Sequence, residues 1–216
     1  MEGKDLWPRL EGELAPGGDL TGRAVQAIER GDVLEGLAFG DTALAGAAGV
    51  RLEFEGCRFL HCAFSPGQIK WLSFVDCAFE KCEFSGARMA GVTLRRCLWR
   101  DCRGVGLDLS GALLHHMALQ DCQFSYIDLA RARLRDVKVE QSDLSFAALL
   151  GTEVKALALR DVSLRGAEIG GTPLAGVDLR SCDIQGIKVG IQQLRGAVVT
   201  PVQACELARL MGLVID

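Results

Sequence analysis

The stretch FEGCRFLHCAF, residues 54–64, places a phenylalanine at every fifth residue and a cysteine two residues before Phe59 and Phe64. A helix face recurs about every 3.6 residues and a strand face every second residue, so neither element alone explains this period. A chain keeps a period of five when it forms short extended segments separated by sharp corners, with two of every five side chains pointing inward. The stretch therefore predicts a solenoid.

The period continues far beyond this stretch. From Phe54 to Val199, every position at this spacing is apolar except Gly104. Upstream, Leu34, Phe39 and Leu44 keep the same register. We therefore expect a repeat region over residues 32–199, with an N-terminal arm or cap over 1–31 that contains a short helix.

The residue two positions earlier is small or moderately apolar. Large side chains at one inward position and small ones at the other suit a narrow, close-packed interior. The small positions include Cys57, Cys62, Cys77, Cys82, Ala87, Val92, Cys97, Cys102, Ala112, Cys122, Val137, Ala147, Ala167 and Cys182. The other three positions of each repeat carry nearly all the charge and are expected to face water.

Segments such as DLSGA (108–112), LRGAEI (164–169) and LAGVDL (174–179) resemble the pentapeptide-repeat proteins. Repetition over this length is a specific signal. The resemblance implies an all-β fold, a right-handed quadrilateral β-helix in which four pentapeptides form one coil. About eight coils would stack over residues 32–199.

Composition agrees with one elongated domain. The chain of 216 residues is 49% hydrophobic and 6% aromatic, which is enough for one continuous core. Residues 1–20 contain charges and prolines without an apolar stretch of signal-peptide length, and no apolar run reaches the roughly 18 residues of a membrane span. We expect a cytoplasmic protein without a membrane partner.

The nine cysteines raise the question of disulfides or zinc. In the coil arrangement Cys57, Cys77 and Cys97 stack on one face, and Cys62, Cys82, Cys102 and Cys122 on the next. Neighbouring thiols would point in parallel at about 4.8 Å, which suits neither a relaxed disulfide nor tetrahedral zinc. We expect free thiols that pack as small hydrophobic groups, and no metal.

Catalytic chemistry has little support in the sequence. His61, His115 and His116 fall on outward positions without a Cys or Asp in a catalytic arrangement, and GGDLTG (17–22) lacks the context of a phosphate site. We therefore expect no catalytic residues, no cofactor and no enzyme activity. SPGQIKW (65–71) and residues 102–107 depart from the plain repeat and are interpreted as distorted corners rather than functional loops.

The C-terminal residues 200–216 leave the repeat. Thr200 is a candidate N-cap, Pro201 suits the first helical position, and Gly212 would end a helix over 201–211. The predicted apolar positions of this helix and of a following edge strand are Val202, Cys205, Ala208, Met211, Leu213 and Ile215. This segment is either a cap on the open end of the solenoid or the interface of a homodimer.

Two segments are similar to the Qnr and MfpA type of pentapeptide-repeat protein. CRGVGLDLSGA (102–112) and DLRSCDIQGIKV (178–189) carry this similarity, the second followed by a helix with Gln203 and Ala204. The resemblance implies a rod that enters the DNA-binding saddle of DNA gyrase or topoisomerase IV and protects it from quinolones. It implies a protein partner, no direct binding of nucleic acid, and a homodimer formed through the C-terminus.

Charge limits the idea of DNA mimicry. Duplex DNA carries one negative charge per about 1.7 Å, so one coil rising about 4.8 Å would need roughly three net negative charges. Residues 51–200 contain 17 acidic and 19 basic residues, which excludes a uniform mimic. Local acidic columns, with one residue from each coil, remain possible partner sites: Asp101, Asp121 and Asp161 on one face, and Asp108, Asp128 and Glu168 on another.

Two interpretations of these columns stay open, an anionic recognition strip and an ordinary mixed-charge surface. Two functional classes follow. One is a topoisomerase-binding regulator or protector, acting against quinolones or a gyrase-directed toxin. The other is a structural or scaffold pentapeptide-repeat protein that binds a different protein.

Overall fold

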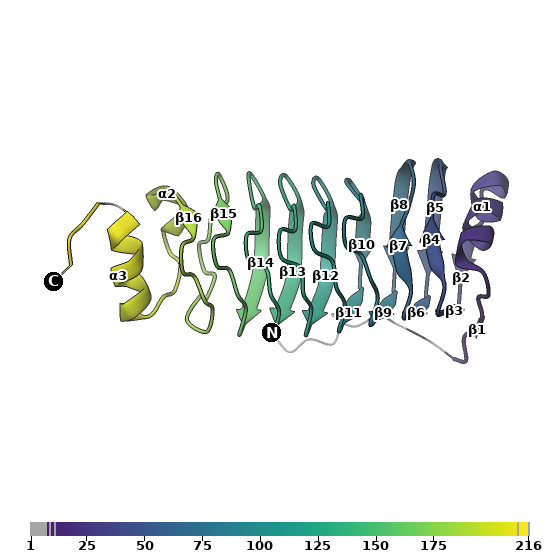
Figure 1. The fold of residues 1–216 in the computed structure, drawn as a ribbon, viewed down its shortest axis with the longest axis horizontal. Coiled ribbons are helices and arrows are strands. Elements are labelled where there is room, and N and C mark those ends of the chain that lie inside the picture. The colour runs from purple at the N-terminus through teal and green to yellow at the C-terminus, as the bar shows by residue number, and fades with distance from the viewer. Residues whose placement is uncertain (1–7, 9, 11, 211, 216) are drawn as a thin grey trace.

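The protein is a rod of stacked coils with a helix at each end (Figure 1). The computed structural model describes residues 8, 10, 12–210 and 212–215. The helices are α1 (Leu20–Arg30), α2 (Ile191–Leu194) and α3 (Pro201–Leu210). The strands are β1 (Ala15–Pro16), β2 (Val33–Glu35), β3 (Leu37–Gly40), β4 (Ala43–Ala45), β5 (Gly49–Glu55), β6 (Arg58–Leu60), β7 (Ala63–Ser65), β8 (Ile69–Val75), β9 (Ala78–Glu80), β10 (Thr93–Arg95), β11 (Leu98–Arg100), β12 (Leu113–Gln120), β13 (Arg133–Glu140), β14 (Glu153–Arg160), β15 (Glu168–Ile169) and β16 (Lys188–Val189).

The register of the strands confirms that four pentapeptides make one coil. Phe54 is opposite Phe74, and Leu114 is opposite both Leu94 and Leu134, always in parallel pairs. The result is a parallel β-solenoid of about nine turns, one more than expected. We call its four faces A, B, C and D; in the coil of residues 113–132 they are centred on Leu114, Leu119, Phe124 and Leu129.

The predicted inward positions form the core. In its first half, phenylalanines of successive coils stack in parallel, as in Phe54–Phe74 with ring centroids 5.0 Å apart and Phe64–Phe84 at 4.7 Å. Burial is incomplete at Ile69, Val154, Leu159, Val189, Leu194 and Val199. The expectation that every fifth residue is buried is therefore correct in register and too strict at these positions.

Gly104, the exception in the repeat, has a structural explanation. Its place on face C is taken by Trp99 from face B, whose ring stacks on Phe84 at 4.5 Å and meets Phe124 edge-on at 5.3 Å. A Cβ atom at residue 104 would lie only 2.6 Å from the Phe124 ring. The absence of a side chain at Gly104 thus leaves room for the Phe124 ring, which meets Trp99 edge-on.

Pro173 interrupts the solenoid wall. In the preceding coils the face A amide donates to a carbonyl of the coil before it, as in Glu153 N to Ala132 O at 2.9 Å. Proline has no N–H, so the corresponding bond to Thr152 cannot form. Residues 153–160 and 173–180 form faces A and B of two successive coils, and all of them are described. No backbone hydrogen bond joins one of these segments to the other.

Faces C and D stay paired at this point, through Ser163 with Asp183 and Glu168 with Lys188. The coils therefore separate on one side only, and we call this opening the wedge. It leaves Val154, Leu157 and Leu159 half-buried instead of buried. The core continues through this point, but the wall of faces A and B is interrupted because the residue that precedes Leu174 is a proline.

Both ends of the rod are covered by helices. At the N-terminal end, Asp19 caps α1 by accepting a bond from Gly22 N, and Leu20, Ala24 and Ala27 are buried. At the C-terminal end, Thr200 Oγ1 accepts from Gln203 N (3.2 Å) and Gln203 Oε1 accepts from Thr200 N (2.9 Å). This reciprocal pair confirms the predicted start of α3.

Candidate functional site

The predicted acidic columns are real alignments in space. Parallel bridges join Asp108 to Asp128, Asp128 to Ala148, and Ala148 to Glu168 on face D. Asp108 and Asp128 each accept a hydrogen bond from the backbone N–H two residues later, at 2.9 and 2.8 Å. Aspartate suits this position because its short side chain closes such a turn.

Pairing with bases differs along the face D column. Glu168 Oε1 accepts a bond from Lys188 Nζ at 2.6 Å, which neutralises that end of the column. No basic side chain of the described residues forms an ion pair with Asp108 or Asp128. Neither aspartate is therefore in an ion pair there, although Arg88 is the register neighbour of Asp108 in the face D column.

The second predicted column runs along the corner between faces B and C. Asp101, Asp121 and Asp161 have φ of 53°, 54° and 54°, a left-handed conformation that aspartate tolerates better than most residues. Gln141 continues the column with φ of 48°. The corner thus fixes these side chains at the edge of face C, one per coil.

Face C between the two columns adds a carboxylate that the sequence reasoning missed. Bridges align Gln123, Asp143 and Ser163, and Asp143 accepts a bond from Ser145 N at 2.8 Å. The signal was present in the sequence, since Asp143 directly precedes the inward Leu144 as Asp108 precedes Leu109. A shallow hollow lies here; its lining includes Asp121, Gln141, Asp143 and Asp161.

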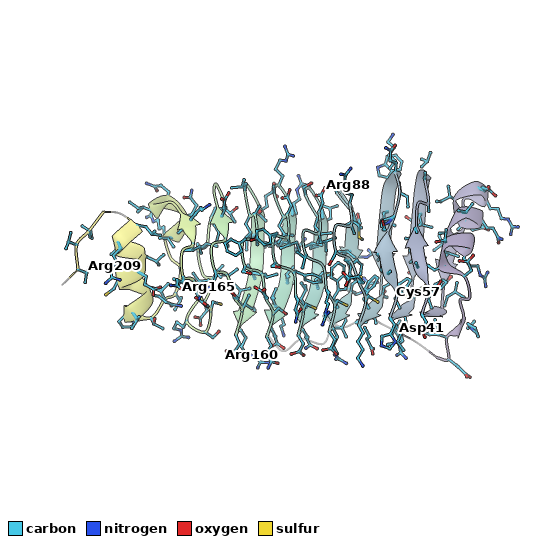
Figure 2. The ribbon with its side chains drawn as sticks, viewed as in Figure 1. Asp41, Cys57, Arg88, Arg160, Arg165 and Arg209 are labelled. Carbon is cyan, nitrogen blue, oxygen red and sulfur yellow. The ribbon has the colours of Figure 1, made fainter. Side chains whose placement is uncertain are left out.

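Basic residues interrupt the acidic surface only in part. Arg165, labelled in Figure 2, forms an ion pair with Asp183 through Nη1 and Oδ2 at 3.1 Å. Arg103 lies in the face C column next to Gln123. In the middle coils carboxylates therefore prevail on face C, its corner and face D.

The opposite face A is basic over the same coils. Arg95, His115, Arg135 and Lys155 are successive partners in the strand register. Partial burial, and next the charge of Arg135, lower the pKa of His115. The near-zero total charge of the repeats thus hides a separation of charge, acidic on C and D and basic on A.

The inward cysteines act as hydrogen-bond donors as well as packing groups. Cys97 Sγ lies 3.4 Å from Phe74 O, and Thr152 Oγ1 makes the same bond to Leu129 O at 2.8 Å. Burial raises the pKa of the Cys97 thiol to about 12. All nine cysteines are free, eight of them are buried and Cys205 is exposed. The described residues contain no cluster of three or more His, Cys, Asp or Glu that fits a metal ion.

The C-terminal helix uses a different face from the one predicted to be apolar. Gln203 and Leu207 are buried, and Gln203 Nε2 donates to Leu179 O and Cys182 O at 2.8 and 2.9 Å. Residues 213–215 form no strand. Of the predicted interface residues, Val202, Cys205 and Leu213 are exposed, Ala208 and Ile215 are half-buried, and Met211 lies outside the described residues. The helix therefore covers the end of the solenoid through Gln203 and Leu207, and not through the predicted apolar set.

Comparison with known families identifies the repeat. Residues 72–149 match the family model described as pentapeptide repeat region. The chain contains a pentapeptide-repeat region. No curated protein matches the chain. No helix among the described residues is long and apolar enough to span a membrane.

Solved structures of pentapeptide-repeat proteins are similar at low identity. Full-length QnrB1, a plasmid-mediated fluoroquinolone resistance protein, is 19% identical, with 85% of this chain and 91% of that chain covered and a TM-score of 0.35. HetL, involved in heterocyst differentiation regulation in the cyanobacterium Nostoc, is 17% identical, with coverage of 82% and 96% and a TM-score of 0.32. Rfr23 of the cyanobacterium Cyanothece is 19% identical, with coverage of 60% and 88% and a TM-score of 0.25.

Proposed function

We propose that this pentapeptide-repeat protein is a non-enzymatic binding protein whose partner is DNA gyrase or topoisomerase IV. The acidic surface of faces C and D would occupy part of the enzyme's DNA-binding saddle. The observation that carries this proposal is the separation of charge in the middle coils, with Asp108, Asp121, Asp128 and Asp143 free of basic partners among the described residues. The proposal places the protein in the cytoplasm with its partner.

The density of charge makes the mimicry partial. The coils of residues 101–120 and 121–140 each present two carboxylates on this surface, Asp101 with Asp108 and Asp121 with Asp128. A duplex would present roughly three charges over the same rise of about 4.8 Å. We therefore expect moderate affinity that falls with salt, since exposed charges are screened.

A homodimer through the C-terminal end belongs to the same proposal. Val202 is 71% exposed, Leu210 is 52% exposed and Val214 is 89% exposed, although all three are apolar. A two-fold contact between two copies of α3 would bury them, and closed two-fold pairing is the commonest solution for soluble chains. Two rods joined end to end would present a long surface to an elongated site.

Gyrase supercoiling in the presence of increasing protein, with and without a quinolone, tests the function. We expect the variant D121N/D128N/D143N to lose inhibition or protection, because three unpaired charges of the acidic surface are removed. The matched control is Glu153→Gln on face A, whose carboxylate pairs with Arg133 at 3.3 Å. Equal activity of wild type and triple variant would refute the proposed mode of binding.

The basic face A supports the second candidate, a scaffold protein with another partner. Arg95, Arg135 and Lys155 belong to one basic column, with His115 between the two arginines, that a topoisomerase saddle would not use. If wild-type protein leaves supercoiling and drug sensitivity unchanged at micromolar concentration, the scaffold function is favoured.

A further inference from the structure

The corner between faces C and D carries an unusual pair of residues. At this corner the backbone is left-handed in every coil from residue 86 to residue 186, and residues 46, 86, 106, 166 and 186 are glycines with positive φ; residue 66 is a proline. The two coils in the middle instead have Tyr126, with φ of 61°, and Phe146, with φ of 58°. Bulky side chains are disfavoured in this conformation, so the corner would be less strained with glycine at both positions.

The two aromatic rings are exposed rather than packed into the core. Tyr126 is 58% exposed and Phe146 is 50% exposed. Their rings are stacked with centroids 4.8 Å apart and planes within 10° of each other. Two large side chains held in a strained conformation and left in water are typical of a binding site, where strain is retained for contact with a partner.

One face of the stack is covered and the other is open. A Cβ atom at Gly166 would lie 2.6 Å from the Phe146 ring, so Phe146 extends over the next coil. On the other side, a Cβ atom at Gly106 would have no atom within 4 Å. The Tyr126 ring thus does not reach the Gly106 corner, and its exposed surface leaves its outer face accessible.

Carboxylates lie on the two faces that meet at this corner. Asp108 and Asp128 follow the corner by two residues in their coils, and Asp143 lies on face C three residues before Phe146. All three accept bonds from backbone N–H groups and none has a basic partner among the described residues. A planar cation that stacks on the ring and bonds to a carboxylate matches this combination.

We propose that Tyr126 and Phe146 form an anchor for an arginine side chain of a protein partner. The guanidinium group stacks on an aromatic face and donates bonds in a planar fork, which lysine does not. The carboxylates argue against a nucleic acid, because its phosphates would meet Asp108 and Asp128. This inference deepens the proposed function, since a surface that binds DNA is rich in arginine, but its test requires no topoisomerase.

The test uses Tyr126 as its own reporter, because it is the one tyrosine of the sequence. An acetylated, amidated Gly-Ser peptide with three arginines is titrated while the Tyr126 ring signals are followed by NMR. We expect saturable shifts, at least fivefold weaker binding with lysines in place of the arginines, and no shifts with glutamines. Equal shifts from the glutamine peptide, or tighter binding of a ten-residue oligothymidylate, would overturn the proposal.

Variants separate binding from folding. Tyr126→Gly and Phe146→Gly place the favoured residue at the corner, so we expect an unchanged or higher melting temperature together with at least tenfold weaker binding of a fluorescently labelled arginine peptide. Asp128→Asn should weaken binding severalfold without a change in melting temperature. If the glycine variants bind the peptide like wild type, or if they melt well below it, the stack is a structural element and the proposal fails.

Discussion

The relation between Trp99 and Gly104 gives the sharpest test of the core. Trp99 is fully buried and occupies the face C space between Phe84 and Phe124 that Gly104 leaves empty. Trp99→Leu should cost about 3 kcal/mol of unfolding free energy, since large-to-small changes at buried aromatics cost ~3–5 kcal/mol when truncated fully. At about 2–4 °C per kcal/mol for a chain of this size, the melting temperature should fall by about 10 °C.

Gly104→Leu should also destabilise, because its Cβ atom alone would approach the Phe124 ring to 2.6 Å. Overpacking of this kind costs about 1–3 kcal/mol. The double variant Trp99→Leu/Gly104→Leu has an ordinary inward side chain at each position. Its loss of unfolding free energy should be at least ~1 kcal/mol smaller than the sum of the losses in the two single variants. Equilibrium urea unfolding followed by circular dichroism measures each free energy.

The control combines Gly104→Leu with Phe59→Leu, on face B two coils before Trp99. Phe59 stacks on Phe39 and Phe79, and the structure gives it no ring contact with Trp99. Its effect should therefore add to that of Gly104→Leu within about 0.5 kcal/mol. If the Trp99 and Gly104 changes also add, Trp99 does not replace a face C side chain and the explanation of the exception is wrong.

Further predictions concern thiols, pH, the wedge and the C-terminal helix. Ellman's reagent should label Cys205 rapidly and the eight buried thiols only on unfolding; several fast thiols in folded protein would contradict their burial. The raised pKa of Cys97 means that the folded state holds this proton more tightly, so stability should be complete below pH 9 and fall as pH rises toward about 12, measured by melting at increasing pH. Pro173→Ala supplies the missing N–H and should raise the melting temperature by a few degrees, whereas Pro66→Ala outside the wedge should not. Val202→Glu should give monomers in light scattering without a change in melting temperature, since this side chain is exposed; a wild-type monomer at micromolar concentration would remove the dimer.

The solenoid was predictable because one period sets both inward positions. Phe54, Phe59 and Phe64 reveal it within a single short stretch, and the coil of four repeats follows from the pentapeptide resemblance. The C-terminal helix was predictable at its start, where Thr200 and Pro201 determine local geometry. Its buried face was not, because Gln203 is polar and becomes buried only through its bonds to two carbonyl groups of the last coil.

Two departures from the regular solenoid, at Gly104 and at Pro173, depend on contacts between coils. The five-residue pattern of apolar positions does not reveal these contacts. Gly104 was noticed as an exception, but its cause is a side chain from a different face. Pro173 falls on an outward position, where the sequence pattern tolerates any residue, and its effect comes from a missing donor in the wall. Both concern contacts between coils, which the composition of one repeat does not specify.

The fold and the recognition surface are encoded at different periods. A side chain that points inward at every fifth position builds the core, whichever of the four faces it lies on. A surface column forms only when outward residues one full coil apart agree, as Asp108 and Asp128 do on face D and Arg95 and Arg135 do on face A with His115 between them. Summing the charge of a repeat mixes the four faces and cancels these columns. The acidic and basic sides therefore become evident only when the outward residues are sorted by face, and the partner is to be sought by the chemistry of one face rather than by the charge of the chain.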